Sequence, residues 1–302
     1  MKVSGFTYFR NAIALQYPCI AAIKSVLSIV DEMIVVIGDS NDGSREAVEA
    51  LNDPKIKIID TVWDMDLRIG GKVFAQQSNI GIDNISKDAD WALHIQADEV
   101  IHEDDLPKIK EAMEVNLNNQ KIDGIALPFL HFYGNYNYYR HTRRTHPIEV
   151  RLFKTNNLVR SYRDSQGFRI YKSLEQYNEN QKKGSKLKVK LIDAPIYHYS
   201  FVRNPMVMAK KGSIFRSFYD NGTEIKREEI VKIPFNFNEV DELTKFNGTH
   251  PEVMSSHIKK MDWKFEYDPS KSNTKLKDKF LNKLEKKTGL RPFDYKNYKI
   301  VK

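Results

Sequence analysis

The sequence predicts an α/β protein, with a mostly parallel sheet flanked by helices and a helical C-terminal extension. Short runs rich in β-branched residues, typical of buried strands, alternate with segments whose apolar residues recur at helical spacing. This alternation is typical of β-α-β units, whose strands are parallel. Near the C-terminus, one narrow apolar stripe lies among many lysines, and Gly289 and Pro292 follow it as a stop signal.

The expected strands are the apolar runs of the first two thirds of the chain, at residues 2–8, 32–39, 55–62, 91–98, 124–133, 149–154 and 186–200. Between them, two helical stripes are clear, formed by Ile20, Ile23, Val26, Leu27 and Val30, and by Leu106, Ile109, Met113 and Leu117. We expect a catalytic and ligand-binding domain at 1–204, and a mostly helical region with a basic amphipathic tail at 205–302.

Composition limits the classes of function. The chain has 302 residues, 41% hydrophobic, and no apolar run that approaches a membrane span or a secretory leader, which predicts a cytoplasmic protein. Cys19 is the only cysteine, which excludes an intramolecular disulfide or a multi-cysteine zinc site. Residues 270–302 carry eleven Lys or Arg and three acidic residues, an excess equal to the net charge of +8. This tail suggests either a solvated helix face, or contact with nucleic acid or an anionic membrane surface. The rest of the chain is nearly neutral, so polyanion binding over the catalytic half is not implied, and no nucleic-acid partner is expected.

Charge at the end of an apolar strand is the first sign of a site. Asp98 and Glu99 follow the run at 91–98, and adjacent carboxylates repel unless a cation or backbone N–H groups compensate. A divalent metal would do so, although a helix cap at Asp98 is an equally adequate explanation. Ligands of parallel α/β sheets bind at the carboxyl ends of the strands, where these residues lie.

Other strand ends add further candidates. Asp39 begins a turn after the second strand, and Asp60 ends the third. The Gly70–Gly71 pair allows close backbone approach before an expected helix near Lys72, and a helix N-terminus with a lysine suits an anion. His198 closes a later strand, where a histidine is more often structural than a ligand, and Arg203 could pair with phosphate.

In this order, the elements resemble glycosyltransferase family 2, the nucleotide-sugar enzymes of GT-A (Rossmann-like) fold, over roughly residues 1–200. The matching motifs are "FTYFRNA" after the first strand, "GDSNDGS" after the second, "GGKVFAQQSN" at a helix start, "QAD" in the place of an Asp-x-Asp motif, and a later histidine. The sequence departs from the family pattern at Gln96, which replaces the first acid, and at Gly38, which replaces one of the usual paired aspartates.

The resemblance implies a metal-dependent, inverting, hexosyltransferase-type transfer. The donor would be a UDP- or GDP-sugar, and the acceptor a hydroxyl of a glycan, a polysaccharide or a lipid-linked sugar. Asp98 and His198 would bind Mn2+ or Mg2+, and Asp39 would contact the base or ribose. The remaining nucleotide-sugar contacts would be Phe6, Thr7, Arg10, Asp60, Lys72, Gln76, Asn79, Gln96, Ala97 and Arg203. The catalytic base would be Asp164 or Glu149, and Asp164 is preferred because it sits in a polar loop.

Two other functions remain open at this point. A nucleotidyltransferase would need a glycine-rich basic loop directly after the first strand, and "GFTYFRNA" has one glycine, placed too early. A non-catalytic sugar- or nucleic-acid-binding protein on a decayed GT-A scaffold would explain Gln96. A dimer through the C-terminal helix is also compatible with the sequence.

Overall fold

The computed structural model describes residues 1–67, 69–165, 167–219 and 233–301. Its helices are α1 (Cys19–Val26), α2 (Ser44–Glu49), α3 (Lys72–Asn84), α4 (Leu106–Asn116), α5 (Leu174–Glu179), α6 (Pro205–Ser217), α7 (Ser255–Lys259) and α8 (Leu276–Thr288). Its strands are β1 (Val3–Phe9), β2 (Glu32–Ile37), β3 (Ile56–Asp60), β4 (Trp91–His94), β5 (Glu99–Ile101), β6 (Gly124–Tyr133), β7 (Tyr138–Arg140), β8 (Ile148–Lys154), β9 (Leu158–Ser161), β10 (Phe168–Tyr171), β11 (Ser185–Leu191), β12 (Ile196–Phe201), β13 (Leu243–Lys245) and β14 (Tyr298–Ile300).

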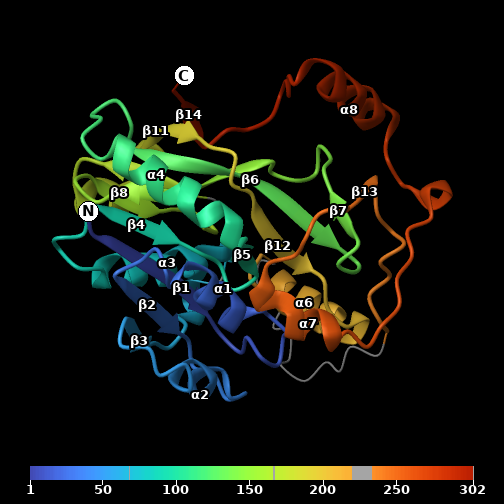
Figure 1. Cartoon of the computed structure of the whole chain (residues 1–302), viewed down its shortest axis with the longest axis horizontal. Helices are drawn as coiled ribbons and strands as arrows, with labels where there is room; N and C mark the ends of the chain where they lie inside the picture. The colour runs from blue at the N-terminus through green and yellow to red at the C-terminus, as the bar shows by residue number, and fades with distance from the viewer. Residues whose placement is uncertain (68, 166, 220–232, 302) are drawn as a thin grey trace.

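The strands join into one continuous mixed sheet in the order β3-β2-β1-β4-β8-β6-β11-β10-β9 (Figure 1). The first four are parallel, and β8 runs antiparallel to both of its neighbours. Strand β12 extends a second part of the sheet by pairing parallel to β6 and antiparallel to β5. The expected α/β class, with a parallel N-terminal half, is therefore confirmed.

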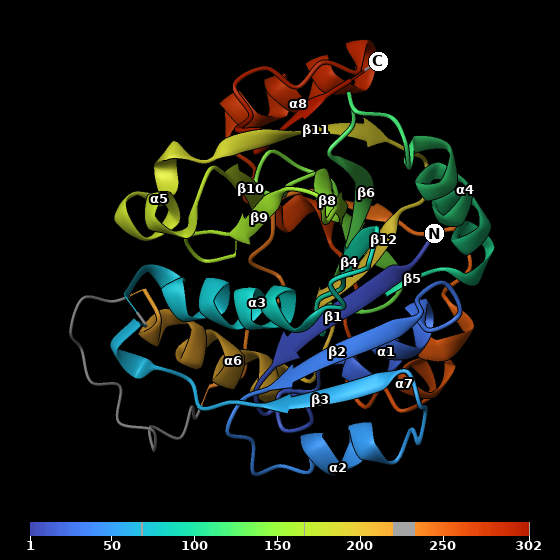
Figure 2. The same cartoon turned by 90° about the vertical axis from the view of Figure 1, so that its left-hand side faces the viewer.

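Alternate residues of each central strand supply the two cores. Met33, Val35 and Ile37 of β2 pack with the apolar stripes of α1 and α4, whereas Ile34 and Val36 face the opposite core. Isoleucines of α3 pack on that second face, across the sheet from α2 (Figure 2). Because neighbouring side chains of a strand point to opposite faces, a sheet covered on both sides needs the continuous apolar runs seen in the sequence.

The long run expected as one strand at 186–200 is divided in the structure. Strand β11 pairs with the beginning of β6 and β12 with its end, and the chain bends between them at Pro195, which has no backbone N–H to donate. The expected strand at 91–98 ends at His94, so that Gln96–Asp98 form an irregular turn before β5. Short strands β7, β9, β10, β13 and β14 were not predicted, because strands of three or four residues carry little periodic signal.

The chain after residue 204 adds both helices and strands. Strand β13 pairs with β7 and β14 with β11, so this region returns to the sheet formed by the first part of the chain. Residues 220–232, within the expected helical region, lie outside the described residues. Among the residues that are described, no helix combines the length and apolar character needed to cross a bilayer.

Candidate active site

A cavity of about 1970 Å³ opens at the carboxyl ends of the parallel strands. Segments following β1, β2 and β4 form one wall, β6, β8 and β12 form its floor, and α6 and the last residues of the chain close it. Its polar lining includes seven of the residues expected from the sequence, Arg10, Asp39, Gln96, Asp98, Glu149, Asp164 and His198. Because parallel strands end at one edge of the sheet, residues far apart in the chain meet there.

Asp98 is a buried carboxylate surrounded by three nitrogen groups. Its Oδ1 lies 3.6 Å from His198 Nε2, and its Oδ2 lies 3.6 Å from Lys211 Nζ and 3.9 Å from Arg203 Nη2. Burial alone would raise the pKa of Asp98, but His198, Lys211 and Arg203 together lower it below its usual range. Asp98 is therefore an anion at neutral pH.

The tautomer of neutral His198 follows from its neighbour on β6. His131 Nε2 lies 2.6 Å from the His146 carbonyl oxygen, which can only accept, so this nitrogen carries the proton. Burial, and then His198, lower the pKa of His131 to about 3, which keeps its ring neutral. Its Nδ1 must then accept a proton from His198 Nδ1, 2.7 Å away. In neutral His198, the lone pair on Nε2 consequently points toward Asp98.

When His198 is neutral, two lone-pair donors face each other on the cavity wall; when it is protonated, its Nε2–H faces Asp98. An imidazole nitrogen and a carboxylate oxygen repel unless a proton or a cation lies between them, and both are suitable ligands for Mn2+. The hydrogen bond to His131 orients the ring from behind, as partners of metal-binding histidines do. The described residues contain no group of three or more His, Cys, Asp or Glu placed to hold a metal, so a bound ion would need further ligands from a substrate.

Glu99 has a different role from its neighbour Asp98. Its side chain is fully buried and forms two hydrogen bonds with the guanidinium of Arg151, at 2.8 and 2.6 Å. The same carboxylate accepts from the backbone N–H of Gln96, 3.1 Å away. The pair therefore fixes the turn that presents Gln96, Ala97 and Asp98 to the cavity.

Breaking this pair should unfold the turn. We expect Arg151→Met to lower the free energy of unfolding by about 3–5 kcal/mol, because Glu99 would be left as an unpaired buried charge. The double variant Glu99→Met/Arg151→Met should recover a large part of that loss in urea denaturation. A single variant that loses less than about 1 kcal/mol, the usual value of a surface pair, would contradict this role.

The two expected base residues both line the cavity but differ in their surroundings. Burial raises the pKa of Glu149 to about 7, with a smaller opposing effect of Arg151. Asp164 accepts a hydrogen bond from the Tyr219 hydroxyl at 3.0 Å, and its other oxygen is buried without a hydrogen-bond partner. Gly71, at the start of α3, lies against this loop, since a Cβ there would come within 2.6 Å of the Asp164 Cβ.

Asp39 and Arg10 form the cavity wall at the ends of β2 and β1. Arg10 Nη2 donates to Asp39 Oδ2 at 2.6 Å, and the backbone N–H of Trp63 lies 3.2 Å from Oδ1. The guanidinium of Arg10 also lies 5.9 Å from the centre of the Trp63 ring. An acidic side chain and an indole thus lie together at the edge of the cavity.

Other expected contacts lie away from the cavity surface. Phe6 is packed in the core, Thr7 is buried, Asp60 pairs with Arg45, and Lys72 and Gln76 are absent from the lining. Asn79 is bonded instead to the backbone of Ser161 and to Tyr177, and Arg203 lies behind Asp98, donating to the Leu15 carbonyl oxygen at 2.7 Å. The reason is shared: these side chains point into the packed layers or to the outer surface rather than toward the strand ends.

Three groups of the cavity could not be identified from the sequence. His131 belongs to an expected strand, and only the pairing of β6 with β12 places it opposite His198. Lys211 lies on α6, and burial, followed by Arg203, lowers its pKa to about 7. Arg291 belongs to the turn after α8. The one available signal was the presence of histidine and lysine within otherwise apolar segments.

Comparisons with known proteins give only distant likenesses. No family model matches the chain, and no curated protein matches it. Among solved structures, S. aureus TarS is 14% identical, with a TM-score of 0.40, over 71% of this chain and 39% of that one. TarS 1-349 in complex with UDP-GlcNAc is 13% identical, with a TM-score of 0.42, over 72% and 66%. Glucosyl-3-phosphoglycerate synthase from Mycobacterium tuberculosis, in complex with Mn2+, UDP and phosphoglyceric acid, is 16% identical, with a TM-score of 0.30, over 44% of each chain.

Proposed function

We propose that the protein is a metal-dependent glycosyltransferase that moves a sugar from a nucleoside-diphosphate sugar to an acceptor hydroxyl with inversion. The observation that carries the proposal is the convergence of a carboxylate and an imidazole, Asp98 Oδ1 and His198 Nε2, 3.6 Å apart at the strand ends. These two residues would hold Mn2+ or Mg2+, and the diphosphate of the donor would complete the coordination. When bound, the ion supplies Lewis-acid stabilisation of the diphosphate leaving group.

The residues around this pair suit each part of the donor. Lys211 lines the cavity beside Asp98, where its ammonium can face a diphosphate oxygen. Asp39 can accept hydrogen bonds from a base or ribose, and Trp63 and Arg10 offer flat groups for stacking. Gln96 would contact the ribose through an amide hydrogen bond instead of the usual carboxylate.

Glu149 is the proposed base. Its carboxylate would take the proton from the acceptor hydroxyl while that oxygen bonds to the anomeric carbon and the bond to the diphosphate oxygen breaks. A base works best when its pKa lies near the working pH, and burial brings that of Glu149 to about 7. Asp164, preferred on the sequence alone, is the alternative; its hydrogen bond from Tyr219 competes with an acceptor hydroxyl.

The acceptor would bind on the side of the cavity that is lined by the C-terminal residues. His141, His146, Tyr295 and Tyr298 line the cavity there. Aromatic and imidazole groups stack on sugar rings and donate to their hydroxyls. A glycan or a lipid-linked sugar is the proposed acceptor class.

A donor screen tests the proposal. Incubating the protein with UDP- and GDP-sugars and Mn2+ should release nucleoside diphosphate from one donor, and calorimetric titration with the same nucleoside diphosphate should show binding that EDTA weakens at least about tenfold. Binding of the nucleotide with the same affinity in EDTA would contradict the metal role. The absence of binding to any nucleotide in the set would contradict the function itself.

A further inference from the structure

The outward side of α8 combines exposed apolar and basic residues. Leu276 and Phe280 are 84% and 68% exposed, and Lys279, Lys283 and Lys287 are exposed beside them. At 100° per residue these side chains share one side of the helix. The opposite side contacts the protein through buried Leu281 and Asn282.

The turn after α8 continues this surface. Leu290 is 65% exposed and Phe293 is 92% exposed, and Phe293 has a left-handed backbone with φ +66°. Such a conformation is uncommon for a bulky residue, so the contacts around it must hold it. We name the set Leu276, Lys279, Phe280, Lys283, Lys287, Leu290 and Phe293 the α8 surface.

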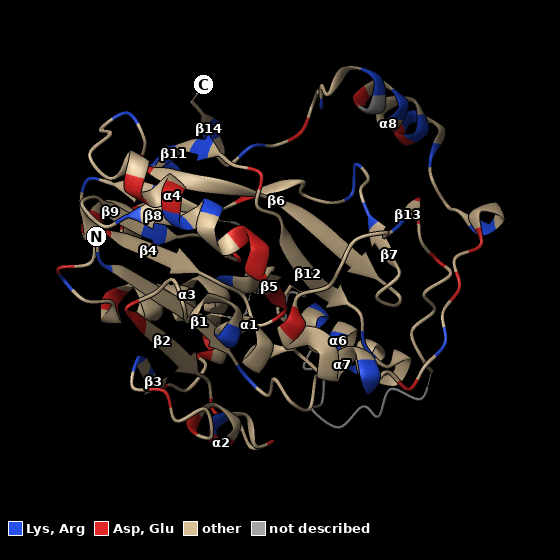
Figure 3. Ribbon diagram, viewed as in Figure 1, with Lys and Arg blue, Asp and Glu red and all other residues tan. Residues whose placement is uncertain are grey.

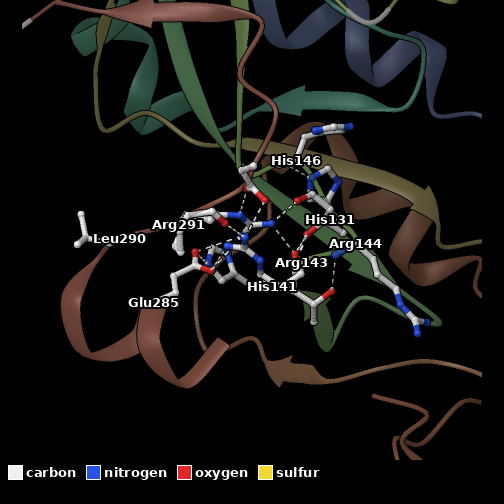
Figure 4. A network of polar contacts seen from close by, with 12 residues as sticks. His131, His141, Arg143, Arg144, His146, Glu285, Leu290 and Arg291 are labelled. Atoms are coloured by element: carbon white, nitrogen blue, oxygen red, sulfur yellow. Dashed lines mark hydrogen bonds and ion pairs between the residues drawn. The ribbon is translucent and has the colours of Figure 1, made fainter. Parts of the chain in front are cut away.

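A network of polar contacts fastens the turn to the body (Figure 4). Arg291 donates to the carbonyl oxygens of Thr142 and Thr145 at 2.7 and 2.6 Å, and Arg143 donates to the Pro292 carbonyl oxygen. Glu285 accepts from Arg291 at 3.2 Å and also contacts His141. The α8 surface is therefore presented on a fixed base, and its apolar side chains are not needed for these contacts.

We propose that the α8 surface docks on an anionic lipid bilayer. Blue basic segments recur along α8, with red acidic segments among them, and both colours occur over the rest of the molecule (Figure 3). Residues 270–302 hold eleven basic and three acidic residues. Exposed Leu and Phe among lysines on one side of a helix are the pattern of interfacial helices, whose apolar groups enter the headgroup boundary while the lysines attract anionic lipids.

The position of the α8 surface beside the cavity indicates the class of acceptor, an inference that rests on the proposed function. Leu290 and Arg291 line the cavity, and Leu290 also belongs to the α8 surface. Docking would bring the acceptor side of the cavity to the level of the lipid headgroups. The acceptor class is then a sugar or alcohol carried on a lipid, rather than a free glycan.

Vesicle co-sedimentation of the full chain tests the docking. We expect binding to phosphatidylcholine vesicles that contain about a third phosphatidylglycerol, weak binding to pure phosphatidylcholine, and loss of binding as salt is raised. The variant Lys279→Glu/Lys283→Glu should bind the anionic vesicles at least about tenfold more weakly. Phe280→Ser/Phe293→Ser should also weaken binding at least about tenfold, since each buried methylene contributes.

Two matched variants serve as controls. Lys87→Glu/Lys121→Glu makes the same charge change at exposed positions elsewhere, and Val62→Ser/Val115→Ser removes side chains that are 78% and 72% exposed. Both should bind vesicles like the unchanged protein. No binding to anionic vesicles, or equal loss in the control variants, would overturn the docking. Nucleotide binding is measured separately in solution, so failure of docking leaves the proposed transfer reaction intact and failure of transfer leaves the docking intact.

Discussion

Asp98→Asn is expected to lower sugar transfer about a thousandfold or more and to remove the effect of Mn2+ on nucleotide binding. The amide keeps the shape of the side chain but removes the negative charge that faces His198, Lys211 and Arg203. Metal stabilisation of a leaving group amounts to several kcal/mol, and each 1.4 kcal/mol is a factor of ten in rate. Steady-state transfer and calorimetry with and without Mn2+ measure the two effects.

The same change should also weaken the fold, because Arg203 loses its nearest carboxylate. The pKa of Asp98 is lowered in the folded state, so its contribution to stability is complete above about pH 4 and is lost as the pH falls. Asp241→Asn is the matched control, since Asp241 is equally buried and accepts from Arg140 at 2.5 Å outside the cavity lining. If Asp241→Asn abolished metal-dependent nucleotide binding to the same extent, the loss in Asp98→Asn would reflect stability alone.

Glu149→Gln is expected to lower the turnover number by about 10²–10⁴-fold, the usual contribution of a general base. Donor binding should be unchanged, because the proposed base would act on the acceptor. In the unchanged protein, transfer should rise with pH up to about 7 and level off above it, following the ionisation of Glu149. The variant should lose this dependence, which a pH series of initial rates would show.

The stability of Glu149→Gln gives a second readout. The pKa of Glu149 is raised in the folded state, so the free energy of unfolding falls as pH rises from about 4.5 to 7, by at most about 1.4 kcal/mol per pH unit. The amide has no charge to desolvate, and the variant should melt at a higher temperature than the unchanged protein at pH 8. Asp164→Asn is the comparison: if it, and not Glu149→Gln, removes transfer, then Asp164 is the base.

Much of the fold could be predicted from periodicity. Helix α3 begins at Lys72, directly after the glycine pair, and α8 ends at Thr288, followed by Gly289 as its left-handed C-cap, as their sequences indicate. The division of 186–200 into two strands could not be predicted, because it depends on which part of β6 each half contacts. Short strands such as β7 and β13 are defined by their pairing, β7 with β6 and β13 with β7, rather than by a periodic pattern of their own.

The site could be predicted in its chemical types but not in its contacts. The sequence does not distinguish Asp98 from Glu99, because both are acids after the same apolar run. In the structure, the Glu99 carboxylate is hydrogen-bonded to Arg151, whereas the Asp98 carboxylate faces the cavity. Asp60 also ends a strand, but its side chain pairs with Arg45, so a strand end alone does not say to which side a side chain points. That direction depends on the packed layers around it.

The sequence by itself determined the order of the longer N-terminal strands and helices and the parallel sheet that they form, because these follow from local periodicity. It also showed which carboxylate and imidazole groups follow the apolar runs. Only the tertiary structure decided the ionisation of these groups. The pairing of β12 with β6 sets the tautomer of His198, α6 places Lys211 beside Asp98, and burial beside β6 shifts the pKa of Glu149. A pKa depends on the charges and solvent within a few ångströms, and folding brings those neighbours from distant parts of the chain.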